Sequence, residues 1–177
     1  HIGGRRTVLF NYLFARKHNG IFVLRIEDTD QNRYVPGAEE YIMACLDWCG
    51  MHPDEGPHTG GPYGPYRQSE RKEIYRQTAE QLVQAGHAYY AFDSTEDLEA
   101  MRIRFKTAQN PAPQYDHSLR MKMRNSLTLA PTEVKQLIES GASHVIRIRV
   151  PENELVGLQD MIRGGVNFNT SQVDDKV

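Results

Sequence analysis

The feature that most constrains the fold is an apolar segment, residues 21–26 (IFVLRI), followed at once by the carboxylates of Glu27, Asp28 and Asp30. A nearly continuous apolar run of this length predicts a parallel strand that is covered on both faces. Residues 5–18 carry apolar side chains at helical spacing, so a helix is expected before the strand. Because ligands of open α/β sheets bind beyond the carboxyl ends of the strands, the carboxylates are expected at a binding site.

The start of the chain, His1-Ile2-Gly3-Gly4, lies at the mouth of the predicted helix. Gly3 and Gly4 have no Cβ, so a nucleotide can pack on their backbone, and a helix N-terminus offers free N–H groups to an anion. His1 can donate a hydrogen bond to a phosphate in a transition state. Together with the carboxylates, this motif indicates a site for a nucleotide and a cationic group. Taken singly, the motifs have simpler interpretations: a glycine turn beside a surface histidine, and a solvated acidic loop.

Composition excludes several classes of protein. The formal net charge of −2 gives no overall attraction to nucleic acid, so a nucleic-acid partner would have to bind a local patch. Cys45 and Cys49 cannot form a disulfide framework and lack zinc-type spacing, so we expect two small buried residues and no metal site. No apolar run has membrane-spanning length and no secretory signal precedes His1, which predicts a cytoplasmic protein without a membrane partner.

The chain is expected to have two parts joined by a Pro/Gly-rich loop, residues 52–66. Residues 1–66 predict a helix, a strand and a helix, which is half of a nucleotide-binding α/β fold. Residues 67–173 predict a mixed α+β region, and residues 174–177 would begin a return to the first part. The predicted class is therefore α/β with an α+β insertion.

Two local patterns in the insertion are specific. Ser94 and Asp97 stand three residues apart before a helical pattern, which predicts a capping box. Residues 144–150 (HVIRIRV) alternate, which predicts a half-buried strand whose cationic outer face carries Arg147 and Arg149.

Three motifs in this order, HIGG, RIEDTD (residues 25–30) and GPYRQSER (residues 64–71), resemble the class I aminoacyl-tRNA synthetases, and specifically the bacterial glutamyl-tRNA synthetases. The similarity covers essentially the whole chain. Further matching segments are residues 32–40 (NRYVPGAEE), 88–92 (AYYAF) and 144–147 (HVIR).

The resemblance implies a partial Rossmann-like catalytic domain followed by an inserted connective domain that binds the tRNA acceptor stem. It implies an enzyme that activates L-glutamate with ATP and Mg²⁺ and then transfers glutamate to the 3′ end of tRNA(Glu). His1, Gly3 and Gly4 would form this chain's copy of the HIGH signature, which holds ATP and its transition state. Glu27 would bind the amino group of glutamate.

Contacts with tRNA are also implied. Asp30 and Arg33 would lie near the terminal adenosine, and Arg147 and Arg149 can contact an RNA backbone. The simpler interpretation of the two strand arginines is a solvated face. We expect a monomer.

The chain departs from the family in several places. It contains neither the strand before HIGG nor the lysine-rich KMSKS loop, so this polypeptide alone is expected to be inactive. Residues 92–95 (FDST) have no cysteine where some relatives bind zinc, so no zinc is expected.

Two alternatives stay open. One is the short paralogue that charges a modified tRNA base with glutamate (the glutamyl-Q tRNA(Asp) synthetases), which shares HIGG and the acidic strand end. The other is a non-catalytic tRNA-binding module built from the insertion. A glutaminyl enzyme is less expected, because that branch usually departs from the IEDTD motif.

Overall fold

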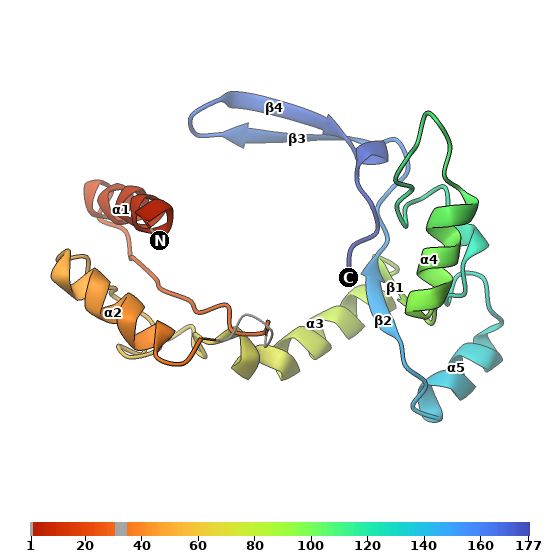
Figure 1. Cartoon of the computed structure of the whole chain (residues 1–177), viewed down its shortest axis with the longest axis horizontal. Coiled ribbons are helices and arrows are strands. Elements are labelled where there is room, and N and C mark those ends of the chain that lie inside the picture. Colours follow the sequence, from red (N-terminus) through yellow and green to blue (C-terminus); the bar gives the residue numbers. More distant parts are fainter. Residues whose placement is uncertain (1, 31–34) are drawn as a thin grey trace. The chain divides into compact units, whose positions relative to one another are not determined.

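The structure, a computed structural model, describes residues 2–30 and 35–177 and leaves aside the side chains of residues 2, 3 and 5. The chain divides into two compact units, His1–Arg76 (unit 1) and Gln77–Val177 (unit 2). Figure 1 shows helices α1 and α2 in unit 1, and two separate antiparallel sheets of two strands each in unit 2. This mixture of helices and strands is that of an α/β protein.

Helix α1 (Ile2–Lys17) begins inside the HIGG motif, earlier than the predicted start at residue 5. The first N–H groups of a helix have no intrahelical partner, so glycines in this turn disturb the helix less than they would in its interior. After the helix, Asn19 adopts a positive φ of 51° and the Gly20 N–H donates to the Ala15 carbonyl at 2.8 Å. This tight turn reverses the direction of the chain.

Residues 21–26 are extended, but the described chain forms isolated parallel bridges at Val23 and Ile26 rather than a regular strand. Phe22 is 6% exposed, whereas Val23 is 46% exposed. The prediction of a strand covered on both faces is therefore wrong for the described residues. An apolar run indicates which residues can be buried, but the segments that cover each face come from distant parts of the chain.

Helix α2 (Ala38–Trp48) follows a left-handed Gly37 with φ 77°. Leu46 is 3% exposed and anchors the helix to the core of unit 1. Cys45 is half-buried and Cys49 is exposed, so the expectation of two buried cysteines is wrong. Cys49 is the C-cap residue that follows Trp48, and its side chain is exposed.

The core of unit 2 lies on one face of a small sheet in which β1 (Ala88–Ala91) pairs with β2 (Val145–Ile148). Tyr89 on β1 is 1% exposed and lies directly opposite Arg147 on β2, so the two side chains share the buried face. The predicted cationic outer face is therefore wrong for Arg147. An arginine can pack its stem and planar head on an aromatic ring, so alternation alone does not identify the buried face.

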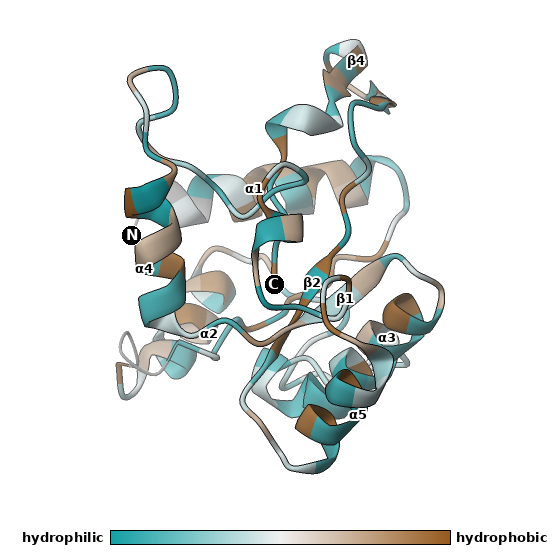
Figure 2. Cartoon of the chain, turned by 90° about the vertical axis from the view of Figure 1, so that its right-hand side faces the viewer, coloured by the Kyte–Doolittle hydropathy of each residue, from teal (hydrophilic) through white to brown (hydrophobic). Residues whose placement is uncertain are grey.

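Helix α4 (Thr95–Arg104) packs on the core of this sheet through Met101 and Leu98. The capping box at Ser94 and Asp97 is confirmed: the Asp97 N–H donates to Ser94 Oγ at 3.1 Å, and the Ser94 N–H donates to Asp97 Oδ2 at 2.9 Å. Figure 2 shows that both α4 and α5 carry hydrophobic and hydrophilic residues. The further elements are α3 (Lys72–Gln84, which begins in unit 1), α4 (Thr95–Arg104), α5 (Pro131–Glu139), β3 (Leu155–Asp160), β4 (Gly164–Asn169) and the 3₁₀ helices η2 (Gln68–Arg71), η3 (Arg120–Lys122) and η4 (Thr170–Gln172).

Candidate functional site

The backbone of the acidic segment in unit 1 is fixed by the second signature motif. The Ile26 N–H donates to the Tyr66 carbonyl, and the Gln68 N–H donates to the Ile26 carbonyl, both at 2.9 Å. A single parallel bridge between Ile26 and Arg67 therefore joins RIEDTD to GPYRQSER.

Asp28 is held by the same neighbouring segment. The Ser69 hydroxyl donates to its Oδ2 at 2.6 Å and the Ser69 N–H donates to its Oδ1 at 2.8 Å. The hydrogen bond from the Ser69 side chain, followed by that from its backbone, lowers the pKa of Asp28 below its ordinary value. Both oxygens of this carboxylate therefore have a partner within the protein, which assigns Asp28 a structural role.

Glu27 differs from its neighbour. Arg25 Nε donates to Glu27 Oε1 at 2.7 Å, and Arg25 Nη2 lies 2.6 Å from the same oxygen. The Glu27 side chain remains 55% exposed. No partner for its Oε2 is found in residues 2–30 and 35–177, so this oxygen can accept a hydrogen bond from a ligand. Asp30, which follows, is also exposed.

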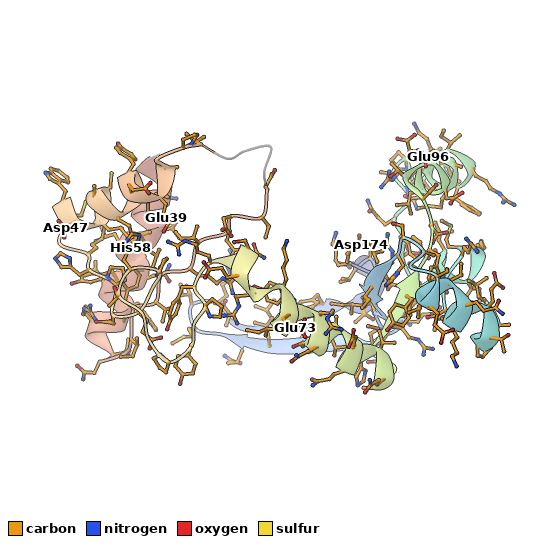
Figure 3. The ribbon with its side chains drawn as sticks, turned by 90° about the horizontal axis from the view of Figure 1, so that it is seen from below. Glu39, Asp47, His58, Glu73, Glu96 and Asp174 are labelled. Atoms are coloured by element: carbon orange, nitrogen blue, oxygen red, sulfur yellow. The ribbon has the colours of Figure 1, made fainter. Side chains whose placement is uncertain are left out.

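A further ion pair joins α2 to the second motif. Arg67 Nη2 donates to Glu39 Oε1 at 2.6 Å and Arg67 Nε donates to Oε2 at 3.1 Å, while His58 Nε2 lies 3.1 Å from Oε1 (Figure 3). The hydrogen bonds from Arg67 are the largest cause of the lowered pKa of Glu39. Such a two-pronged contact fixes orientation as well as distance. Arg67 therefore holds the motif against α2.

A groove in unit 1 lies between α1 and the extended segment that follows it. Residues of α1 from Val8 to His18 and the segment from Gly20 to Arg25 line one groove of about 480 Å³. The turn after α1 sends the chain back along the helix. From Gly4 to Lys17 the helix advances about 20 Å, and from residue 21 to Glu27 the extended chain returns about 20 Å. From these two lengths we expect the returning chain to bring Glu27 toward the first turn of α1.

This first turn suits an anion. It contains no acidic side chain, so the positive end of the helix dipole is not neutralised there. A Cβ added to Gly4 would meet nothing within 4 Å, so the backbone at this position is open. The backbone of Gly3 lies in the same turn. His1 and Arg33, the other two predicted site residues of unit 1, lie outside the described residues.

The predicted tRNA contacts in unit 2 have different surroundings. Arg147 lies over the ring of Tyr115, 4.1 Å from its centroid, and its Nη1 donates to the Asp175 carbonyl at 2.8 Å. Arg149 is exposed and lines a cavity of about 540 Å³. Within unit 2, Arg149 therefore has its charge available to a partner, whereas Arg147 is engaged in the protein.

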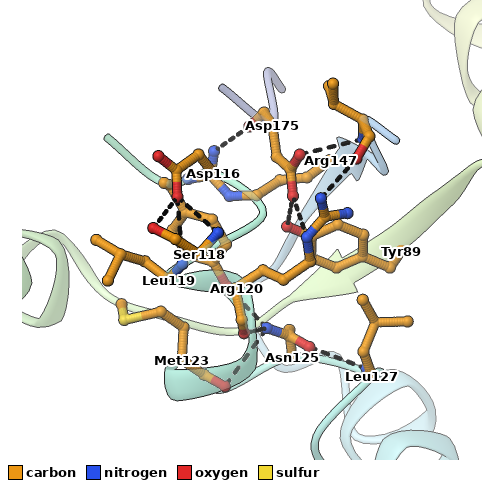
Figure 4. Close-up of polar contacts among 12 residues, drawn as sticks. Tyr89, Asp116, Ser118, Leu119, Arg120, Met123, Asn125, Leu127, Arg147 and Asp175 are labelled. Carbon is orange, nitrogen blue, oxygen red and sulfur yellow. Dashed lines mark hydrogen bonds and ion pairs between the residues drawn. The ribbon is translucent and has the colours of Figure 1, made fainter. Parts of the chain in front are cut away.

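Asp175 is the centre of a buried polar network in unit 2 (Figure 4). The Tyr89 hydroxyl donates to its Oδ2 at 2.6 Å, the Val150 N–H donates to its Oδ1 at 3.1 Å, and Arg120 Nε lies 3.4 Å from Oδ2. Burial, and then the hydrogen bond to Asp175, raise the pKa of Tyr89. The network secures the segment after η4 to the sheet.

Sequence reasoning identified the carboxylates but not the residues that hold them. Arg25 and Arg67 were not expected to have a role, and Ser69 was not expected to contact Asp28. Arg25 stands two positions before Glu27 in an extended segment, and side chains at this spacing share a face. That spacing was the available signal. For Ser69 and Arg67 the contacts are made across 41 and 28 positions, which no local pattern indicates.

Comparison with known proteins decides the family. A family model described as tRNA synthetases class I (E and Q), catalytic domain, matches residues 1–177. This chain belongs to that family. It is 58% identical to a glutamate–tRNA ligase of Amoebophilus asiaticus (strain 5a2) over 177 residues, which are 100% of this chain and 35% of the relative. It is 56% identical to the glutamate–tRNA ligase of Cytophaga hutchinsonii, again over the whole chain and over 34% of the relative.

Solved structures of the family agree. A glutamate tRNA ligase of Elizabethkingia meningosepticum, in complex with its amino acid, superposes with a TM-score of 0.92 at 50% identity, covering 100% of this chain and 35% of that one. The glutamate-tRNA synthetase of Elizabethkingia anophelis gives a TM-score of 0.91 at 50% identity and 36% coverage of its own chain. This chain thus spans about a third of the length of these family members.

Over residues 2–30 and 35–177, no helix is long and apolar enough to cross a membrane. In the same part of the chain, no group of three or more His, Cys, Asp or Glu side chains is placed to hold a metal ion.

Proposed function

We propose that this chain is part of a glutamate–tRNA ligase, which activates L-glutamate with ATP and transfers it to the 3′ end of tRNA(Glu). One observation carries the proposal: the Glu27 carboxylate, held by Arg25 through Oε1, has an open Oε2 just after the segment that runs back along α1. The relatives named glutamate–tRNA ligase support it, because they match the whole chain at 56–58% identity.

The reaction asks for alignment more than for covalent participation by the protein. A carboxylate oxygen of glutamate attacks the α-phosphorus of ATP, which enters as its magnesium complex, and diphosphate leaves. The terminal ribose hydroxyl of the tRNA then attacks the acyl carbon, and AMP leaves. The first turn of α1, with His1, Gly3 and Gly4, would meet the phosphates through N–H donors. Glu27 would hold the amino group of glutamate, so that the carboxylate points to the phosphorus.

Unit 2 would supply contacts to the acceptor stem. We propose that residues 67–173 form the inserted connective domain and that residues 174–177 begin the return to the catalytic domain. Arg149 is the more suitable of the two strand arginines for an RNA phosphate, because it is exposed whereas Arg147 packs on Tyr115. Contacts of Asp30 and Arg33 with the terminal adenosine, the absence of zinc, a monomeric state and a cytoplasmic location stay predictions.

Activity assays on the full-length protein test this function. We expect ATP–diphosphate exchange that depends on L-glutamate, and charging of tRNA(Glu) at its 3′ end. Charging of an internal modified base of tRNA(Asp) would instead identify the short paralogue. Tight tRNA binding without any ATP-dependent reaction, measured at several salt concentrations, would identify a binding module. We expect the 177-residue polypeptide alone to show background exchange.

A further inference from the structure

We propose that Arg25 is a positioning residue for the glutamate site: it holds Glu27 by one carboxylate oxygen and so presents the other oxygen to the substrate ammonium. This inference rests on the proposed function, because it deepens the role given there to Glu27. It concerns a side chain to which neither the motif nor the comparisons give a role.

The contact is one-sided. Nε and Nη2 of Arg25 both approach Oε1 of Glu27, at 2.7 and 2.6 Å. A guanidinium that spanned both carboxylate oxygens would occupy a lone pair on each of them and leave an ammonium group fewer sites. Because the arginine meets Oε1 alone, the lone pairs of Oε2 remain open to a third group. The pair is therefore compatible with a bound amino group instead of competing with it.

The backbone on both sides of Glu27 is also fixed. Ile26 makes two backbone hydrogen bonds of 2.9 Å with the segment at residues 66–68. The Asp28 side chain accepts two hydrogen bonds from Ser69, at 2.6 and 2.8 Å. Glu27 stands between these fixed residues and points to the opposite side of the extended chain from them, where it meets Arg25. Only the side chain of Glu27 is then free to rotate, and Arg25 restricts this rotation.

Restricting this rotation matters because Glu27 is 55% exposed. A free glutamate side chain at such a position samples many rotamers, and ordering it on binding costs conformational entropy. A carboxylate that is already ordered in the unbound protein avoids this cost when the ligand arrives. Arg25 would therefore increase the affinity for the amino group without touching the substrate.

The experiment compares two competing ligands in the full-length enzyme. L-Glutamate has the ammonium group, and 2-hydroxyglutarate, used as a competitive inhibitor of glutamate-dependent ATP–diphosphate exchange, replaces it by a hydroxyl. We expect Arg25→Met to raise the KM for glutamate by about tenfold and the Ki of 2-hydroxyglutarate by less than about twofold, since a charged donor depends more on a fixed carboxylate than a neutral one. The KM for ATP should not change.

Two further variants complete the test. Arg25→Lys keeps a donor near Oε1 and should recover part of the loss. Arg124→Met is the matched control, because Arg124 makes a comparably exposed ion pair of 3.5 Å with Glu133 within unit 2. The double variant Arg25→Met/Glu27→Gln should have the same KM for glutamate as Glu27→Gln alone, because the arginine acts through this carboxylate.

An unchanged KM for glutamate in Arg25→Met would overturn the inference. So would a lowered KM, because it would mean that Arg25 competes with the substrate for Glu27. An equal rise in the KM for glutamate and the Ki of 2-hydroxyglutarate would overturn it as well. If Glu27→Gln itself leaves the KM for glutamate unchanged, the proposed role of Glu27 fails with it. If Glu27→Gln raises the KM and Arg25→Met does not, the inference about Arg25 fails alone. Should Arg25→Met not fold, Arg25→Gln replaces it in the same assays.

Discussion

The two units each contain an arginine–carboxylate pair, and the pairs differ mainly in burial. In unit 2 the side chains of Arg120 and Asp175 are 7% and 0% exposed, and Tyr89 and the Val150 backbone complete the hydrogen bonds of the carboxylate. In unit 1 the side chains of Arg25 and Glu27 are 51% and 55% exposed, and one oxygen of Glu27 is left open. A buried pair that is fully satisfied stabilises a fold, whereas an exposed and incomplete pair is available to a ligand.

The first prediction tests the buried pair, where the largest effect is expected. Asp175→Ala leaves the Arg120 charge buried without its partner, and it also removes the acceptor of Tyr89 and Val150. Breaking a buried pair in this way should reduce the stability of unit 2 by about 3–5 kcal/mol. Hydrogen exchange of β1 and β2 in the full-length protein measures this loss. The control is Asp174→Ala, which removes a half-buried carboxylate paired with Lys176. A loss of protection no greater than in this control would show that the network does not stabilise the sheet.

Tyr89→Phe is a milder change in the same network. It keeps the ring but removes the hydroxyl that donates to Asp175 Oδ2 at 2.6 Å. A hydrogen bond to a charged group contributes about 1.5–3 kcal/mol, so the protection of the sheet should fall by less than in Asp175→Ala. An equal loss of hydrogen-exchange protection in the two variants would mean that the contacts of Asp175 with Arg120 and Val150 do not stabilise the sheet.

The sequence predicted features that depend on neighbours along the chain. The Ser94–Asp97 capping box is confirmed because both hydrogen bonds join residues three positions apart. The helix at residues 5–18 is likewise present, although it begins at Ile2. The motifs also identified the family correctly.

Features that depend on distant neighbours were predicted less well. The burial of Arg147 is decided by Tyr115, which lies on a loop far from β2 in the sequence, so alternation placed the arginine on the wrong face. The apolar residues 21–26 were assigned two covered faces, but Val23 remains 46% exposed in the described chain. In the candidate site, the acidic residues were found, whereas their partner Ser69 lies 41 positions away.

A smaller change in stability is expected when the hydrogen bonds from Ser69 to Asp28 are removed. Because its hydrogen bonds lower the pKa of Asp28 in the folded state, they stabilise the protein above the unfolded pKa of this carboxyl group. That stabilisation is lost as the pH falls through the lowered, folded pKa. Ser69→Ala should therefore lower the melting temperature of the full-length protein at pH 7, and lower it less in acid. Ser140→Ala, which removes a serine hydroxyl on the surface of unit 2, is the control.

The exchange kinetics of Glu27→Gln in the full-length enzyme test the central claim, that the open carboxylate oxygen in unit 1 binds the amino group of glutamate. Loss of one charged contact should reduce kcat/KM for glutamate by an amount equivalent to roughly 2–3 kcal/mol, with the KM for ATP unchanged. Glu40→Gln, at an exposed position of α2, should behave as the wild type. An unchanged KM and kcat for glutamate in Glu27→Gln would contradict the account.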